Sequence, residues 1–181
     1  MTVKLKSGVY EIVNHQHKNH AGLTEDKVIR GDTFENQKDI VDRKLLWRVT
    51  LLGNGKRSIR NNKSTFYTVC DQPPRESCSI FAKATCLSQW AIVDTGNTGC
   101  YAIAPTNNPN LFWGLNDAEL GTPILLRNAG SNPANWWSFR RWKAKRNKKL
   151  LYDEQILDCQ PLAGTVMGAT GILGAQNDAE V

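Results

Sequence analysis

Apolar and polar residues alternate along several short segments of the chain, a pattern typical of half-buried β-strands. One such segment, with the five-residue pattern Gly-x-(Tyr or Arg)-x-Ile, occurs three times. The copies run from Gly8 to Ile12, from Gly55 to Ile59 and from Gly99 to Ile103, with the glycines 47 and 44 residues apart. Each copy predicts a turn followed by a strand.

Each copy is followed by a tryptophan in a second alternating segment, 35 to 39 residues after its glycine: Trp47, Trp90 and Trp137. Two more strand candidates lie between these landmarks in every unit. One set comprises residues 22–23, 66–67 and 112–113, and the other residues 28–29, 80–81 and 124–126. Four strands in each of three units predict an all-β fold. Helical periodicity is not sustained in the first 140 residues, and residues 34–47 come closest to it.

The repeat length of about 45 residues would also suit a β-propeller blade, but propellers close with about 4–8 blades. Three units that each contribute one large aromatic residue to a shared core predict a β-trefoil with pseudo-threefold symmetry. We expect this domain at residues 1–142, with repeats at about 6–52, 53–97 and 98–142. Residues 143–181 form a C-terminal extension that is first basic and then glycine-rich.

The glycine openings, the tryptophan closings and the stretches 112–115 and 121–125 resemble the fungal β-trefoil superfamily. Within it, the chain is similar to the ricin B-like lectins and to their relatives, the mycocypin and cospin-type protease inhibitors. The resemblance covers roughly residues 6–142 and implies the trefoil fold. It leaves the function open, because trefoils present sugar sites, protease-binding loops or other protein interfaces on one scaffold.

Composition agrees with a folded domain, since 40% of the 181 residues are apolar and 22% are charged. The chain contains no uninterrupted run of 18 or more apolar residues, so no membrane span is predicted. Much of the net charge of +6 is concentrated between Arg140 and Lys149, so we do not expect nucleic acid as a partner, although such a run could contact phosphates. The odd count of five cysteines, without an evident export signal, favours reduced thiols and a cytoplasmic location.

The resemblance implies carbohydrate binding, but not at the usual ricin-type sites. The expected second-strand aspartate and the Gln-x-Trp closing are absent from all three units. Some fungal trefoil lectins instead use one site in the third unit, where a Trp-Gly step is flanked by amide side chains. The predicted carbohydrate-binding residues are therefore Trp113, Gly114, Asn107, Asn108, Asn110 and Asn116. In the alternative reading, Phe112 or Trp113 fills the core and the asparagines form turns, since strand alternation allows only one of these two rings inward.

Protease inhibition is the alternative function. The segment between Cys70 and Cys78 contains Pro73, Pro74 and Arg75, and prolines lower the cost of ordering a loop that mimics a substrate. Arg75 would then enter the acidic specificity pocket of a trypsin-like protease. Against this, the same segment also fits a polar surface loop with two reduced cysteines at its base.

Catalysis and metal binding are not predicted. The chain has neither a Gly-x-Ser-x-Gly nor a Cys/His nucleophile signature, so we expect a protein that is not an enzyme and needs no cofactor. His15 and His17 would share a face of a strand, with His20 nearby, but no adjacent Cys or Glu completes a set of metal ligands. The expected partner is a glycan or glycoprotein, or alternatively a protease. The sequence leaves open the identity of the sugar or protease and the oligomeric state.

Overall fold

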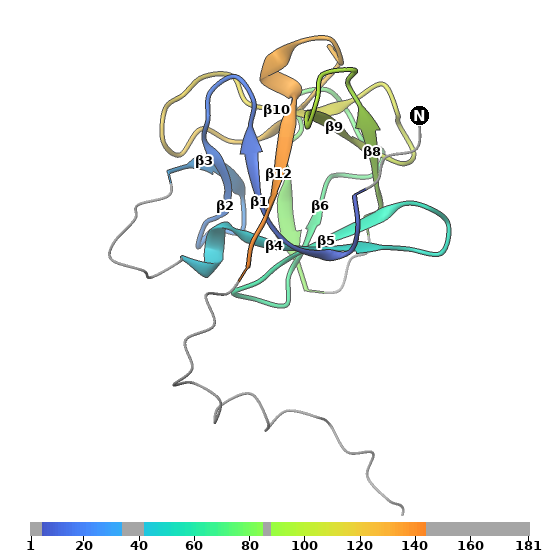
Figure 1. The fold of residues 1–181 in the computed structure, drawn as a ribbon. Coiled ribbons are helices and arrows are strands. Elements are labelled where there is room, and N and C mark those ends of the chain that lie inside the picture. Colours follow the sequence, from blue (N-terminus) through green and yellow to red (C-terminus); the bar gives the residue numbers. More distant parts are fainter. Residues whose placement is uncertain (1–4, 34–41, 85–87, 144–181) are drawn as a thin grey trace, which may run out of the picture. The chain divides into compact units, whose positions relative to one another are not determined.

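The computed structural model describes residues 5–33, 42–84 and 88–143. Twelve strands and two short 3-10 helices lie in these ranges (Figure 1). The first repeat holds β1 (Gly8–Asn14), β2 (His20–Leu23), β3 (Ile29–Asp32), η1 (Arg43–Leu45) and β4 (Leu46–Leu51). The second holds β5 (Arg57–Asn61), β6 (Tyr67–Val69), β7 (Phe81–Lys83) and β8 (Trp90–Asp94). The third holds β9 (Tyr101–Pro105), β10 (Phe112–Gly114), β11 (Leu125–Arg127), η2 (Pro133–Asn135) and β12 (Trp137–Arg141).

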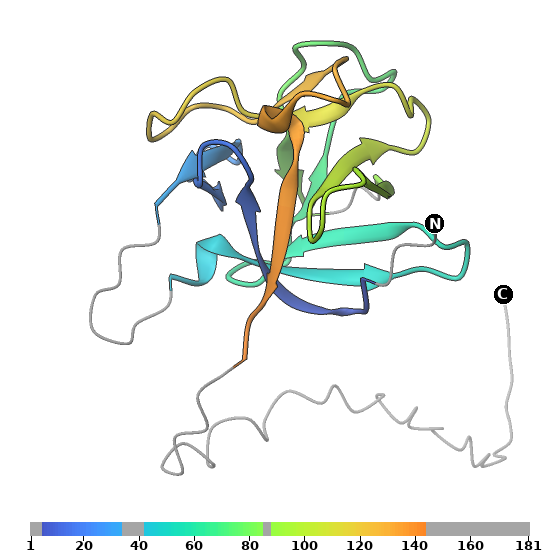
Figure 2. The ribbon, with the colours of Figure 1, turned by 45° about the horizontal axis from the view of Figure 1, so that its top comes forward.

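The first and last strands of the repeats close into a six-stranded antiparallel barrel. β1 pairs with β12 and β4, β5 with β4 and β8, and β9 with β8 and β12. Figures 1 and 2 show β12 running alongside β1. Closure gives each of these strands a hydrogen-bonded neighbour on both sides, which removes the exposed edges of an open sheet.

The inner strands of the repeats form three hairpins that cover one end of the barrel: β2 with β3, β6 with β7, and β10 with β11. Three isoleucines join the hairpins in a ring of backbone hydrogen bonds. Ile29 donates to Ile80 at 2.8 Å, Ile80 to Ile124 at 2.9 Å, and Ile124 back to Ile29 at 2.9 Å. A barrel capped by three hairpins in this way is a β-trefoil, so the predicted fold class is confirmed.

The repeated tryptophans form the core with the repeated isoleucines. Trp47, Trp90 and Trp137 are fully buried. Their indole N–H groups donate to equivalent carbonyl oxygens on the second strand of their own repeats: those of Ala21, Thr68 and Trp113, at 2.7, 3.3 and 2.8 Å. Each closing tryptophan therefore fills the core and also ties its outer strand to its hairpin.

Two details refine the sequence expectations. Trp90 and Trp137 begin their strands and Trp47 is the second residue of β4, because each tryptophan lies where the chain enters the barrel from the hairpin side. Within residues 34–47, which come closest to helical periodicity, the described part forms the short η1 turn and the start of β4. Residues 34–41 and most of the C-terminal extension, from residue 144, lie outside the described residues.

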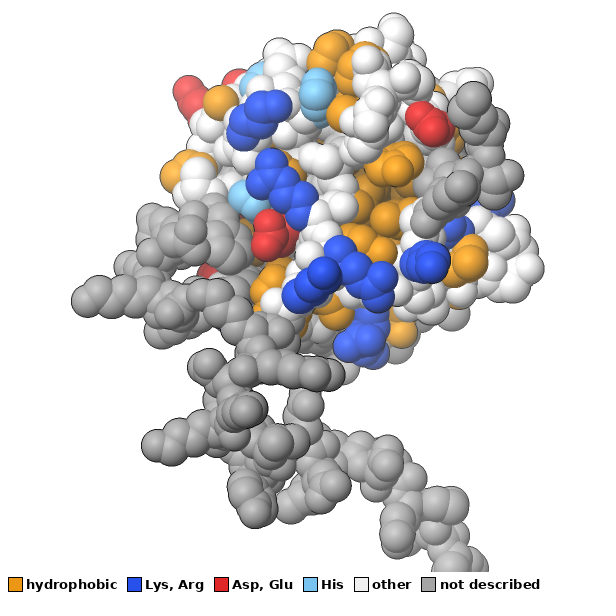
Figure 3. Space-filling model, viewed as in Figure 1, with side chains coloured by type: hydrophobic (Ala, Val, Ile, Leu, Met, Phe, Trp, Pro, Cys, Tyr) orange, Lys and Arg blue, Asp and Glu red, His pale blue; other side chains and the backbone are white. Residues whose placement is uncertain are grey.

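Basic side chains gather over the lower half of the face in Figure 3, in the region of β12, β4 and β5. Arg48 of β4 and Arg140 and Arg141 of β12 are exposed. Within the described residues, no helix has the length and apolar character needed to cross a membrane.

Candidate functional site

Trp113 lies in the core, which contradicts its predicted role in carbohydrate binding. Its side chain is 0% exposed. The ring packs edge to face between Trp90, at a centroid distance of 5.1 Å, and Trp137, at 6.3 Å. A sugar needs an open ring face, and Trp113 has none to offer. Phe112, its neighbour on β10, is the half-exposed ring of the pair, as strand alternation requires.

Gly114 is buried, and its lack of a side chain serves packing. A Cβ atom at this position would lie 2.2 Å from Oδ1 of Asn135 and 2.6 Å from Cγ of Arg127. Glycine is therefore required by the close approach of β10 to η2, and the predicted Trp-Gly sugar platform loses its aromatic ring, Trp113, to the core.

The four predicted asparagines have different surroundings. Asn116 accepts a hydrogen bond from the guanidinium of Arg127 at 2.5 Å. Asn108 accepts one from the backbone N–H of Asn110 at 3.4 Å, a local turn contact. Asn107 differs from these, because its amide donates to Oε1 of Gln72 at 2.5 Å, 35 residues away in the chain. Asn107 and Gln72 both line a pocket.

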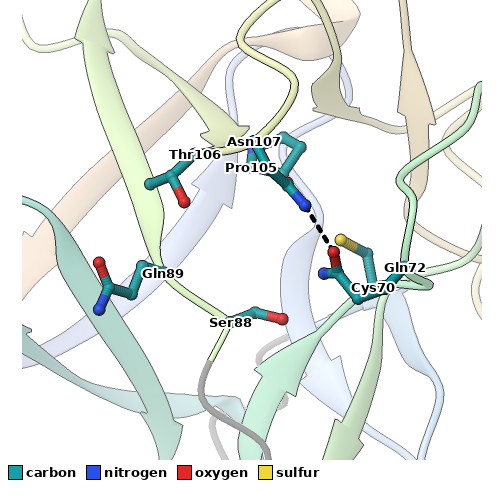
Figure 4. A pocket seen from close by; sticks show the side chains of 7 residues that line it. All are labelled: Cys70, Gln72, Ser88, Gln89, Pro105, Thr106 and Asn107. Carbon is teal, nitrogen blue, oxygen red and sulfur yellow. Dashed lines mark hydrogen bonds between the residues drawn. The ribbon is translucent and has the colours of Figure 1, made fainter.

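The pocket lies where the end of β9 approaches the start of β8 and the segment after β6, and it has a volume of about 320 Å³ (Figure 4). Its polar lining comprises Gln72, Ser88, Gln89, Thr106 and Asn107, and Cys70 and Pro105 complete it. We call it the amide pocket. Gln72 belongs to the loop that was considered for protease binding, and Asn107 to the loop considered for sugar binding. The fold thus brings together two loops that the sequence suggested for different functions.

A break in the pseudosymmetry coincides with this pocket. Asn14 and Asn61 occupy equivalent positions, six residues after the opening glycines of their repeats, and both are fully buried. The amide of Asn14 donates to the carbonyl oxygen of Ala134, and that of Asn61 to the carbonyl oxygen of Lys44, both at 2.8 Å. Each asparagine therefore fastens the end of a first strand to the segment just before a closing tryptophan.

The third repeat has Pro105 at the equivalent position, and proline has no side-chain amide. A backbone bond is present at all three junctions. The backbone N–H of His15 donates to the backbone carbonyl of Trp136, and that of Asn62 to the backbone carbonyl of Leu46, both at 2.8 Å. In the third repeat the backbone N–H of Thr106 donates to the backbone carbonyl of Gln89 at 3.2 Å. The third junction therefore keeps its backbone closure but lacks the asparagine, and the amide pocket opens there. Aligning the three repeats at this position is the sequence signal that could have located the pocket.

The pocket is polar without being charged. None of its seven described lining residues carries a charged side chain. Gln72, Gln89 and Asn107 each have a donor and an acceptor in their amide groups. The side-chain oxygen Oε1 of Gln89 accepts a hydrogen bond from Nδ2 of Asn54 at 2.7 Å, which holds the Gln89 side chain in place. Oγ of Ser88 is buried and has no hydrogen-bond partner among the residues described.

The loop that carries Arg75 is exposed at its tip. Pro73 and Arg75 are exposed, whereas Pro74 is buried and anchors the loop. The carbonyl oxygen of Arg75 accepts a hydrogen bond from the Cys78 N–H at 3.3 Å, which closes a turn directly after Arg75. A substrate-like loop would have to offer that oxygen to the protease oxyanion hole. The Cys78 thiol is free, so no disulfide closes this loop.

A Cys–His contact lies elsewhere, between segments 85 residues apart. Sγ of Cys100 is 3.2 Å from Nδ1 of His15. Burial raises the pKa of the Cys100 thiol, and a reactive cysteine needs the opposite shift, because the thiolate is the nucleophile. No group of three His, Cys, Asp or Glu side chains within the described ranges could hold a metal ion.

No protein-family model and no curated protein matches the chain. Solved structures do match it. The agglutinin of Rhizoctonia solani is 18% identical with a TM-score of 0.67, covering 78% of this chain and all of that one. The ricin B-like lectin of Macrolepiota procera, solved with lactose, is 20% identical with a TM-score of 0.67, covering 77% of this chain and all of that one. A proteinase inhibitor from Coprinopsis cinerea is 18% identical with a TM-score of 0.58, covering 77% of this chain and all of that one.

The chain shares the fold of fungal β-trefoil lectins and inhibitors. At these identities the likeness shows the fold alone, so the function has to be inferred from the site. These neighbours are two lectins and an inhibitor, and none of the three is described as an enzyme.

Proposed function

We propose that this protein binds a glycan through the amide pocket. The observation that carries the proposal is an uncharged pocket lined by three amides, Gln72, Gln89 and Asn107, and two hydroxyls, Ser88 and Thr106. Sugar hydroxyls both donate and accept hydrogen bonds, and amide side chains match both roles. A volume of about 320 Å³ suits a small polar ligand such as a single sugar ring.

The pocket is built from parts of the molecule that the fold holds firmly. Ser88 and Gln89 directly precede β8, and Thr106 and Asn107 directly follow β9, two paired strands of the barrel. Gln72 is held by Asn107 and follows β6 by three residues. Groups fixed in this way lose little freedom on binding, so more of their interaction energy contributes to affinity.

A glycan array with the full-length protein tests the proposal, together with variants of two exposed lining residues, Asn107→Ala and Thr106→Ala. Asn110→Ala is the matched control, because Asn110 is exposed in the same loop but does not line the pocket. Loss of one neutral hydrogen bond should weaken binding by about 3- to 10-fold in each pocket variant and leave the control unchanged. A blank array with folded protein, or equal losses in all three variants, would overturn the proposal.

Protease inhibition is the second candidate, favoured by the exposed Arg75 on a loop anchored by the buried Pro74. The loop is also tied to the third repeat, since the Ser77 N–H donates to the Leu126 carbonyl at 2.8 Å. Inhibition assays against trypsin and papain, with Arg75→Ala beside the unaltered protein, test this candidate. Inhibition of trypsin that disappears in Arg75→Ala would support it, and retained glycan binding in that variant would show that the two surfaces act separately.

A further inference from the structure

A second cleft adjoins the amide pocket and shares Ser88 and Gln89 with it. It has a volume of about 430 Å³ and lies on the outer face of β4, β5 and β6. Arg48, Thr50, Ser58, Arg60 and Tyr67 supply its polar groups. We call it the arginine cleft. Because two residues belong to both depressions, a ligand longer than one sugar can extend from one into the other.

Arg48 and Arg60 are direct neighbours across the β4–β5 ladder. Like charges placed opposite each other on antiparallel strands destabilise the pair unless something neutralises them. Among the described residues, the ion pairs within 4.0 Å have His20, Arg30 and Lys44 as their cations, and none includes Arg48 or Arg60. The described part of the protein therefore leaves two adjacent guanidinium groups unneutralised beside the amide pocket.

The surroundings of the two arginines suit a small anion. Thr50 and Ser58 form the cross-strand pair two positions further along the same face and bring two hydroxyls to the cleft. The Arg60 guanidinium lies 5.9 Å from the centroid of the Tyr67 ring. Guanidinium groups bind planar or tetrahedral oxyanions through paired N–H donors, which makes such contacts stronger than those between neutral groups.

We propose that the glycan recognised by this protein is acidic, with a carboxylate or sulfate held by Arg48 and Arg60 and a neutral sugar held in the amide pocket. This inference rests on the proposed function, because the amide pocket supplies the selectivity for a sugar. The arginine cleft then decides which class of glycan binds, since a neutral glycan leaves the two charges unmatched.

The test compares lactose, sialyllactose and sulfated lactose as probes, which share a neutral disaccharide and differ in the anionic group. Dissociation constants are measured by titration calorimetry for the full-length protein and for Arg48→Gln and Arg60→Gln. Lys63→Gln is the control, because Lys63 is an exposed cation near β5 that does not line the cleft. We expect at least one acidic probe to bind about tenfold or more tightly than lactose, and this preference to disappear in both arginine variants but not in the control.

The outcomes separate the two proposals. If lactose and both acidic probes bind with equal affinity, and Asn107→Ala weakens the binding of all three, the role of the arginine cleft alone would be overturned. Acidic binding that depends on Arg48 and Arg60 but not on Asn107 would overturn the amide pocket alone. The absence of binding by every probe would overturn both. Competition by an oligonucleotide as effective as that by the acidic sugars would also overturn this inference, because it would show attraction to any polyanion. Equal dissociation constants for sialyllactose and sulfated lactose would mean that the protein recognises the negative charge alone. Different dissociation constants would identify the anionic group that the cleft prefers.

Discussion

The buried asparagines at two of the three repeat junctions carry a prediction that tests how the pocket arises. Asn61 makes four hydrogen bonds with its side chain. Its amide nitrogen donates to the carbonyls of Lys44 at 2.8 Å and Leu46 at 3.4 Å, and its oxygen accepts from the N–H groups of Lys63 at 2.9 Å and Ser64 at 3.3 Å. Asn61→Ala removes all four bonds from a fully buried position.

The expected loss of stability is about 2–3 kcal/mol. The two shorter bonds contribute about 1 kcal/mol each, and the cavity together with the unpaired Lys44 carbonyl adds up to about 1 kcal/mol more. The longer bonds add little, since the Leu46 carbonyl still accepts from the Asn62 N–H at 2.8 Å. In urea, with a slope of about 2 kcal/mol/M, the unfolding midpoint should fall by about 1–1.5 M.

Urea unfolding followed by tryptophan fluorescence measures this change. Asn62→Ala is the matched control, because the adjacent Asn62 joins the junction through its backbone, which alanine keeps. We expect the control to change stability by less than about 0.5 kcal/mol. A loss below about 1 kcal/mol in Asn61→Ala, or an equal loss in the control, would refute the view that the asparagine fastens the junction. The explanation of the pocket by Pro105 would then fail as well.

The remaining predictions concern the core and the response to pH. Trp137→Phe should cost about 1–2 kcal/mol more than Trp113→Phe in urea unfolding, because the Trp137 indole donates to a carbonyl at 2.8 Å whereas that of Trp113 has no partner among the described residues; equal losses would contradict this. Burial lowers the pKa of His20, although the carboxylate of Glu11 at 3.5 Å opposes the shift. A depressed pKa in the folded state means that stability is complete above the unfolded value of about 6.5 and is lost as the pH falls below it. His20→Gln should flatten this loss below about pH 6.5, and an unchanged pH profile would show that other groups cause it.

The repeat pattern was enough to determine the fold. Glycine openings and tryptophan closings reflect a requirement that every repeat must meet, since each has to turn, enter the barrel and place one large ring in the shared core. Because all three repeats meet the same requirement, the pattern occurs three times and can be recognised in a single sequence. Strand alternation also indicated that only one of Phe112 and Trp113 could point inward. It could not indicate which, because that depends on the partners Trp90 and Trp137 across the core.

The candidate site was decided by tertiary structure. Gln72 and Asn107 are 35 residues apart and lie in different repeats, and Ser88 and Gln89 reach the same pocket from the start of β8. Amides and hydroxyls of this kind are common in turns, so their residue types alone do not distinguish a binding residue from a turn residue. The sequence by itself determined the three-part architecture and its core, because these depend on periodic burial. Only the folded chain decided that a pocket opens at the Pro105 junction, because a pocket depends on which loops the barrel brings together.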